Sequence, residues 1–157
     1  MKKLLAAVFT LTLFISCSSS DKDAPVSPPK DYSAENDKEI TDYLTKNNLT
    51  ATKSTTGLYY IINEPGTGAQ PNASSKVTVA YKGYFTNGSV FDQSSASGVT
   101  FPLSEVIKGW TEGIPYFKEG GSGVLLIPAH LGYGSYANAK IPAGSVLIFD
   151  VKLLKVN

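Results

Sequence analysis

The sequence predicts an α+β fold in which one antiparallel sheet wraps around a single short helix. Several short runs alternate between apolar and polar residues, which is the two-residue period of a half-buried strand. Turns that contain glycine and asparagine separate these runs. The one helical segment among them surrounds Trp110, the only tryptophan of the chain. We find no internal repeat and no second domain, so the expected layout is one sheet packed on one helix.

Composition indicates one globular domain and excludes several functions. The chain has 157 residues, of which 42% are apolar and 17% are charged. Its net charge is +1 and all 14 basic residues are lysines, which argues against nucleic-acid binding because arginine and clustered basic charge carry such contacts. The single cysteine permits no internal disulfide. His130 is the only histidine and has no second ligand residue nearby, so we expect a surface residue, no metal site and no cofactor.

The N-terminus has the features of an export signal. Two lysines precede a mostly apolar run over residues 4–15, which is too short to span a membrane. Ser16 and Cys17 follow and resemble a bacterial lipoprotein cleavage site, which implies a signal peptide over residues 1–16 and lipidation of Cys17. The alternative is a plain secretory signal, with Cys17 discarded or left free. Because Ser18 follows Cys17, the lipoprotein interpretation predicts a lipid-anchored protein of the bacterial cell envelope, at the outer membrane.

A tether and a helix are expected between the anchor and the sheet. Residues 17–32 are rich in serine, aspartate and proline, so we expect a flexible tether. Residues 33–56 form an N-terminal extension with a helix over residues 33–48, for which Ser33 is the expected N-cap. The helix has a narrow apolar stripe with which it should lean on the domain: Ile40, Tyr43, Leu44 and Leu49.

Strand patterns recur through residues 57–157. They cover residues 57–62, 77–81, 89–91, 124–127 and 147–153. Asn87-Gly88 predicts a hairpin between the second and third of these runs. In the last run Asp150 and Lys152 share a solvated face, and the opposite face is apolar: Leu147, Phe149, Val151 and Leu153. Pro115 should end or kink the helix around Trp110.

Six short motifs make the chain resemble a known family. They are Tyr81-Lys82-Gly83, Phe91-Asp92-Gln93-Ser94, Val106-Ile107-Lys108-Gly109-Trp110, Gly132-Tyr133-Gly134, Ile141-Pro142 and Ile148-Phe149-Asp150-Val151. Each motif is weak alone, but in this order and approximate spacing they resemble the FKBP-type peptidyl-prolyl isomerases, the immunophilins that bind tacrolimus and rapamycin. Residues 33–56 resemble the helical extension of bacterial secreted members. The resemblance implies a five- to six-stranded antiparallel half-barrel around one short helix over residues 57–157.

The resemblance also implies a pocket between the sheet and the helix. Trp110 would be its floor, the Ile107 backbone N–H would receive a substrate carbonyl, and Asp92 and Tyr133 would be polar contacts; these four are the expected catalytic residues. Asp92 would either orient Tyr81 or meet the substrate carbonyl carbon. The expected substrate-binding residues are Tyr81, Phe91, Val99, Val106, Ile141 and Phe149. Without the resemblance, Trp110 would be interpreted as a core residue, Asp92 as a loop cap and Tyr133 as a turn residue.

Two loops depart from the family pattern. Phe101 aligns with a core phenylalanine, and Val99 stands where the family has a pocket-wall phenylalanine. Ser95, Ala96 and Ser97 stand where a basic residue is frequent. We expect these departures to change drug affinity and sequence preference more than activity.

The resemblance implies an enzyme that assists protein folding outside the cytoplasm. A dry aromatic pocket suits prolyl isomerisation because a twisted amide loses its resonance and becomes less polar. The expected partners are proline-containing polypeptides, unfolded or partly folded, with rapamycin or tacrolimus as a ligand, and the expected state is a monomer. The alternatives are an FKBP-like module that binds clients with little turnover and a structural cell-surface lipoprotein. The retained pocket aromatics argue against both.

Overall fold

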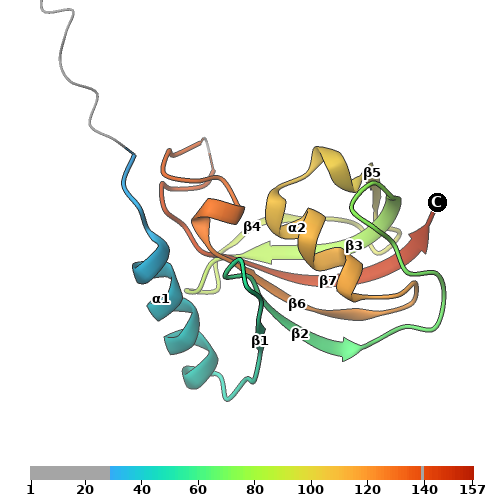
Figure 1. Cartoon of the computed structure of the whole chain (residues 1–157), viewed down its shortest axis with the longest axis horizontal. Helices are drawn as coiled ribbons and strands as arrows, with labels where there is room; N and C mark the ends of the chain where they lie inside the picture. The colour runs from blue at the N-terminus through green and yellow to red at the C-terminus, as the bar shows by residue number, and fades with distance from the viewer. Residues whose placement is uncertain (1–28, 139) are drawn as a thin grey trace, which may run out of the picture.

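The computed structural model describes residues 29–138 and 140–157. The predictions for the signal peptide, Cys17 and most of the tether lie outside the described residues. The first described elements are α1 (Ser33–Lys46), β1 (Thr52–Lys53), β2 (Tyr59–Glu64), β3 (Lys76–Tyr84), β4 (Val90–Gln93) and β5 (Val99–Pro102). They are followed by η1 (Leu103–Glu105), α2 (Lys108–Gly113), η2 (Ile114–Tyr116), β6 (Ser122–Ile127), η3 (Ala129–Leu131) and β7 (Leu147–Val156), where η marks a 3₁₀ turn (Figure 1).

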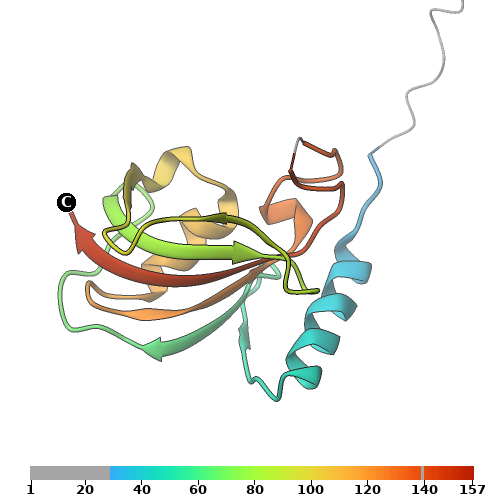
Figure 2. The same ribbon diagram turned by 180° about the vertical axis from the view of Figure 1, so that it is seen from behind.

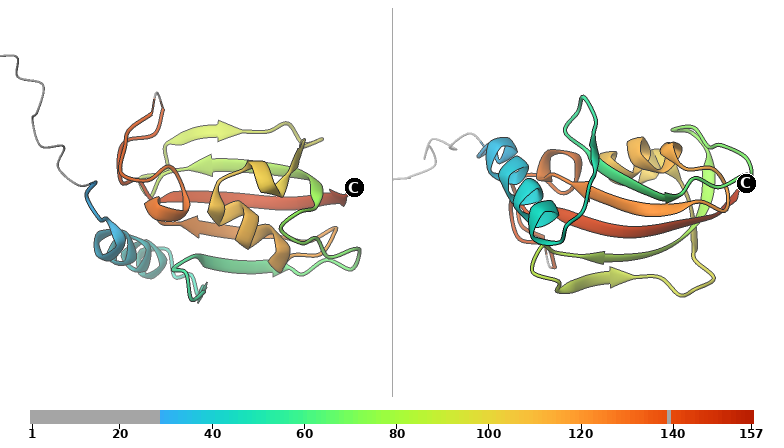
Figure 3. Two further views of the ribbon diagram at one scale, coloured as in Figure 1. Left: turned by 45° about the horizontal axis from the view of Figure 1, so that its top comes forward. Right: turned by 90° about the horizontal axis from the view of Figure 1, so that it is seen from below.

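The strands form one antiparallel sheet in the order β1-β2-β6-β7-β3-β4, and β5 also pairs with β3. The sheet curves around α2, which confirms the predicted architecture (Figure 3). It has seven strands in the described part of the chain, one more than the upper end of the prediction. The unforeseen strands β1 and β5 have two and four residues, which is too short to show a clear alternation.

The inner face of the sheet and α2 enclose the main apolar cluster, which we call the inner cluster. Its members include Leu58, Val77, Ile114, Leu125 and Leu153, whose side chains are at most 1% exposed. Burying each such side chain contributes about 1.5–3 kcal/mol. Gly109 lets α2 approach β6, because a Cβ at this position would lie 2.5 Å from Cγ2 of Ile127. As predicted, the α-helix stops just before Pro115, and η2 follows.

A second cluster lies on the opposite face, under α1, and we call it the outer cluster. It joins Ile40 and Leu44 of α1 to Tyr59, Leu126, Val146 and Ile148. The predicted alternation along β7 is confirmed, with Asp150 and Lys152 exposed. Ile148 is buried on the face that the alternation would expose, because it packs in one cluster with Ile40 and Leu44 of α1. Figure 2 shows α1 beside one end of the sheet.

Helix α1 leans on the domain as predicted, but its ends differ from the prediction. The Ser33 side chain does not cap the helix; the Asp31 carboxylate instead accepts the Ser33 backbone N–H at 2.9 Å. The helix ends at Lys46, and Asn48 has a left-handed φ of 52°, which an α-helix cannot contain. Polar contacts add to the packing, since the Tyr59 hydroxyl donates to Asp37 at 2.7 Å. None of the described helices has the length and apolarity to cross a membrane.

Candidate active site

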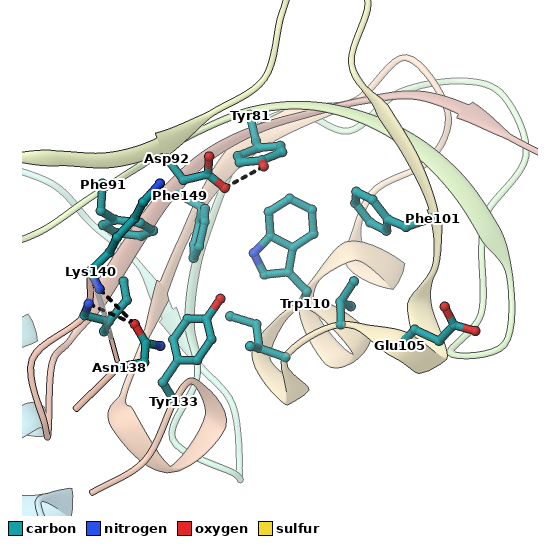
Figure 4. Close-up of a pocket in the computed structure, with 13 residues that line it drawn as sticks. Tyr81, Phe91, Asp92, Phe101, Glu105, Trp110, Tyr133, Asn138, Lys140 and Phe149 are labelled. Atoms are coloured by element: carbon teal, nitrogen blue, oxygen red, sulfur yellow. Dashed lines mark hydrogen bonds between the residues drawn. The ribbon is translucent and has the colours of Figure 1, made fainter. Parts of the chain in front are cut away.

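A hollow of about 840 Å³ opens between the inner face of the sheet, α2 and the segment that joins β6 to β7. We call this segment, residues 128–146, the flap loop; its residue 139 is outside the described residues. Aromatic and aliphatic side chains dominate the lining (Figure 4). The lining residues are Tyr81, Phe91, Asp92, Phe101, Glu105, Val106, Ile107, Trp110, Tyr133, Asn138, Lys140, Ile141 and Phe149.

Trp110 forms the floor of this hollow and is only 4% exposed. Its ring centroid lies 5.1 Å from that of Tyr81 and 5.2 Å from that of Phe149, and both pairs are nearly perpendicular, at 90° and 86°. Aromatic rings favour such edge-to-face packing. Figure 4 shows the indole between Phe149 on one side and Phe101 on the other. The result is an aromatic surface in which three neighbouring rings pack on Trp110.

The second wall is built from Phe91 on β4 and Phe149 on β7, whose rings meet edge to face at 5.5 Å. Gly83 on β3 makes this contact sterically feasible. A Cβ on Gly83 would lie 2.7 Å from both rings, so any side chain there would displace them. The glycine of the Tyr-Lys-Gly motif is therefore required by the close approach of two aromatic rings.

Tyr81 and Asp92 form the polar pair at the rim. The Tyr81 hydroxyl donates to Asp92 Oδ2 at 2.7 Å, and the Gln93 backbone N–H donates to Asp92 Oδ1 at 2.9 Å. Burial raises the pKa of Tyr81 to about 12, and the hydrogen bond to Asp92 adds to the effect. The Tyr81 hydroxyl therefore stays protonated at neutral pH. Of the two roles considered for Asp92, this geometry supports the one that orients Tyr81.

Ile107 presents a free backbone donor at the start of α2. Its carbonyl accepts the N–H groups of Trp110 at 2.9 Å and Thr111 at 3.2 Å, as expected of the residue that precedes a helix. Its own N–H has no acceptor within residues 29–138 and 140–157. Since Ile107 lines the hollow, this N–H is chemically suited to bind a carbonyl.

The flap loop brings Tyr133 and Ile141 to the mouth of the hollow. Asn138 fixes the local turn before Ile141, because its Oδ1 accepts the backbone N–H groups of Lys140 at 3.1 Å and Ile141 at 3.0 Å. Ile141 is 5% exposed, whereas Tyr133 is 49% exposed. In Figure 4 the Tyr133 hydroxyl points towards Trp110 across the mouth. A polar donor and an apolar cap thus face the aromatic floor.

The structure corrects the expectation for Val99. Val99 is 45% exposed and is not part of the lining, whereas Phe101 lines the hollow and packs on Trp110 with ring centroids 5.3 Å apart. Both belong to β5, where residues two apart share a face. Phe101 was assigned to the core on the basis of alignment alone, and its contact with Trp110 shows that one side chain serves both core and pocket.

Three lining residues were not foreseen: Glu105, Asn138 and Lys140. Each lies within three residues of a motif residue that was predicted, Val106 or Ile141. That proximity was the available signal, but loops have no side-chain period, so their sequence does not say which residues face the site. The other nine predicted pocket residues all line the hollow.

Nothing in the described ranges indicates metal chemistry. Residues 29–138 and 140–157 contain no group of three potential metal-binding side chains. His130 is exposed, as expected, and its Nε2 lies 2.8 Å from the Thr56 carbonyl oxygen.

The comparisons with known proteins point to one family. The family model for FKBP-type peptidyl-prolyl cis-trans isomerases matches residues 67–154. The probable FKBP-type peptidyl-prolyl cis-trans isomerase FkpA of Neisseria meningitidis serogroup B is 50% identical over 103 residues, which cover 64% of this chain and 38% of that protein. FkpA of Aeromonas hydrophila is 41% identical over 143 residues, which cover 88% of this chain and 50% of that protein. The chain therefore spans half or less of the length of these relatives.

Solved structures agree. The crystal structure of FkpA from Escherichia coli is similar with a TM-score of 0.71 and 40% identity, covering 80% of this chain and 61% of that one. A peptidyl-prolyl cis-trans isomerase from Pseudomonas syringae pv. tomato has a TM-score of 0.68 and 28% identity, covering 86% of this chain and 98% of that one. On the family match and these likenesses, the chain belongs to the FKBP-type peptidyl-prolyl cis-trans isomerase family.

Proposed function

We propose that this domain catalyses the cis-trans isomerisation of X–Pro peptide bonds in unfolded or partly folded polypeptides. The observation that carries the proposal is the largely aromatic and aliphatic hollow around Trp110. On its rim are a hydroxyl at Tyr133 and an N–H at Ile107 that has no acceptor among the described residues. The reaction needs rotation about one bond and no nucleophile, which suits a site of this composition.

The chemistry follows from amide resonance. Rotation about a peptide bond has a barrier of about 18–20 kcal/mol because the planar amide is resonance-stabilised. For X–Pro bonds the two isomers are close in energy, but they exchange over tens to hundreds of seconds. The twisted amide is less polar than the planar one, so an apolar pocket favours the twisted form, and this difference lowers the barrier.

Each group in the hollow then has a role. Trp110, Tyr81 and Phe149 enclose the proline ring. The Ile107 N–H and the Tyr133 hydroxyl hold carbonyl groups on either side, so that only the X–Pro bond turns. Asp92 accepts the Tyr81 hydroxyl hydrogen and thereby keeps that ring in place at the rim. Rapamycin or tacrolimus would occupy the same hollow and inhibit the enzyme.

The activity test uses a soluble form that begins near Ala24. A protease-coupled assay on an Ala-Xaa-Pro-Phe peptide should show acceleration over the uncatalysed rate and inhibition by rapamycin. Tyr136→Ala is a suitable control, because this tyrosine is on the same flap loop, is 68% exposed and does not line the hollow. A correctly folded protein without acceleration would instead support the client-binding module.

We also propose that the protein acts in the bacterial cell envelope, anchored by lipid on Cys17 and held off the outer membrane by the tether. Ser16-Cys17 after an apolar run supports this proposal. In cells, Cys17→Ser should move the protein from the membrane fraction to the soluble fraction and abolish labelling with a radioactive fatty acid. Unchanged membrane association and labelling of the variant would contradict the anchor.

A further inference from the structure

The N-terminal extension is joined to the base of the flap loop through one buried side chain, Asn36 of α1. Asn36 is 2% exposed and is the only buried polar side chain within residues 29–138 and 140–157. A buried amide without hydrogen-bond partners would destabilise the fold, so the partners of Asn36 indicate its structural role.

Those bonds join the two ends of the flap loop. Asn36 Nδ2 donates to the Gly144 carbonyl at 2.9 Å, and Asn36 Oδ1 accepts the Ala129 backbone N–H at 2.8 Å. Only one orientation of the amide satisfies both partners, because one is an acceptor and the other a donor. Ala129 precedes Tyr133 and Gly144 follows Ile141, so the single side chain holds together both ends of the segment that supplies these two pocket residues.

Backbone hydrogen bonds within the flap loop connect the residues that Asn36 contacts to the residues that line the hollow. The Gly134 N–H donates to the Ala129 carbonyl at 2.7 Å, and the Gly144 N–H donates to the Gly134 carbonyl at 3.0 Å. Tyr133 is bonded directly to Gly134. The position of the Tyr133 ring at the mouth is therefore set by a hydrogen-bonded base to which Asn36 is attached at both ends.

Two further contacts of the extension reach the same base. A Cβ on Gly144 would lie 2.3 Å from Cε1 of Tyr32, so the tyrosine ring packs directly against that glycine. The Ser135 hydroxyl donates to the Lys30 carbonyl at 2.5 Å. Residues before and at the start of α1 thus contact the flap loop at several independent points.

We propose that Asn36 is a positioning residue of the isomerase and that the N-terminal extension is part of the active site's support, although it touches no substrate. The inference rests on the proposed function. By hydrogen-bonding to both ends of the flap loop, Asn36 holds Tyr133 and Ile141 at the distance from Trp110 that a bound proline needs. A small misplacement of groups that contact substrate can cost up to about a hundredfold in rate.

The test compares Asn36→Leu with Leu44→Ala in the full chain, purified in detergent. Leucine has the same branched arrangement of side-chain heavy atoms as asparagine but makes neither hydrogen bond. Leu44→Ala weakens the packing of the same helix in the outer cluster, which includes Val146 at the end of the flap loop, but removes neither hydrogen bond of Asn36. We expect Asn36→Leu to lower kcat/KM about tenfold, mainly through KM, and to accelerate amide hydrogen exchange at Ala129, Gly134 and Gly144. Leu44→Ala should leave kcat/KM within about twofold at temperatures where it is folded.

Asn36→Ser is an intermediate variant, since the serine hydroxyl can hydrogen-bond to one of the two partners. Its kcat/KM and its amide exchange rates should lie between those of wild type and Asn36→Leu. It replaces Asn36→Leu in the test if that variant does not fold. Equal kcat/KM and equal exchange in wild type and the Asn36 variants would overturn the proposal, as would an activity loss no larger than that of Leu44→Ala. If wild type itself shows no isomerase activity, the proposed function fails, and the exchange data alone still decide whether Asn36 holds the loop.

Discussion

Each face of the sheet carries an apolar cluster, and the two clusters differ in whether they are covered or open to solvent. The outer cluster is covered by α1, and the buried Asn36 of that helix has a hydrogen bond at both its amide nitrogen and its amide oxygen. The inner cluster opens into the hollow, and there the Trp110 Nε1 has no hydrogen-bond partner within the described part of the chain. Leaving a buried donor unmet costs about 1–3 kcal/mol. The closed face therefore supplies stability, whereas the open face gives up some stability to present a binding surface.

The largest effect should come from removing the floor of the open face. Trp110→Ala or Phe149→Ala takes away a ring that packs on the rest of the pocket, so isomerase activity should fall by at least about a hundredfold, because several kcal/mol of differential binding disappear. Truncating a buried aromatic also costs about 3–5 kcal/mol in the free energy of unfolding. Urea unfolding must therefore accompany the assay, and activity is compared only at temperatures where each variant is folded. A folded Trp110→Ala protein with wild-type activity would show that the hollow is not the active site.

Truncating a buried apolar side chain on the closed face should lower stability without lowering activity. Leu126→Ala removes a fully buried side chain of the outer cluster and should cost about 2–5 kcal/mol in the free energy of unfolding. Leu126 does not line the hollow, so kcat/KM of the folded fraction should stay within about twofold of wild type. A large loss of kcat/KM in this variant would show that the two faces are not independent.

Strand β5 allows a matched comparison of two positions two residues apart. Phe101→Ala should lower kcat/KM about tenfold because it removes a ring that packs on Trp110. Val99→Ala should have no measurable effect on kcat/KM, because Val99 is outside the hollow. The same protease-coupled assay checks both. The reverse ranking would restore the original expectation that Val99 is a pocket wall.

The smallest effect concerns the rim and appears only at high pH. Burial and Asp92 raise the pKa of Tyr81 to about 12 from an ordinary value near 10. A folded-state pKa above the unfolded value means that the protonated hydroxyl favours the folded protein. This contribution is complete below about pH 10 and is lost as the pH rises through about 12. Over that window the free energy of unfolding should fall more steeply for wild type than for Tyr81→Phe, as measured by urea unfolding at each pH. Parallel pH curves would show that Tyr81 does not titrate in this way.

The sequence predicted the open face better than the closed one, for physical reasons. The pocket residues were predicted from the resemblance of six short motifs to a known family, and nine of the ten expected residues line the hollow. Val99 was expected in the pocket because it stands where the family has a pocket-wall phenylalanine, but the β5 side chain that lines the hollow is Phe101. Glu105, Asn138 and Lys140 lie in irregular segments, where no period marks the inward side.

On the closed face, the apolar stripe of α1 was visible, but the role of Asn36 was not. Asparagine near a helix start usually indicates local hydrogen bonding, and its actual partners are 93 and 108 residues away in the chain. The Ser33 cap was wrong for a local reason. The hydroxyl and the backbone N–H of Ser33 both donate to the Asp31 carboxylate, and the hydroxyl does not cap the N–H groups of the first helical turn. The contacts of Asn36, by contrast, join distant segments, and local patterns do not contain them.

Trp110 is the only tryptophan of the chain, so its fluorescence reports on the floor of the hollow without interference from another indole. The most direct measurement titrates the protein with an Ala-Xaa-Pro-Phe peptide and, in parallel, with the same peptide carrying alanine in place of proline. If the hollow encloses the proline ring, the proline peptide will change the Trp110 emission saturably and the alanine peptide will not. An unchanged emission at peptide concentrations that saturate catalysis, or an equal change with both peptides, would contradict a proline site at Trp110.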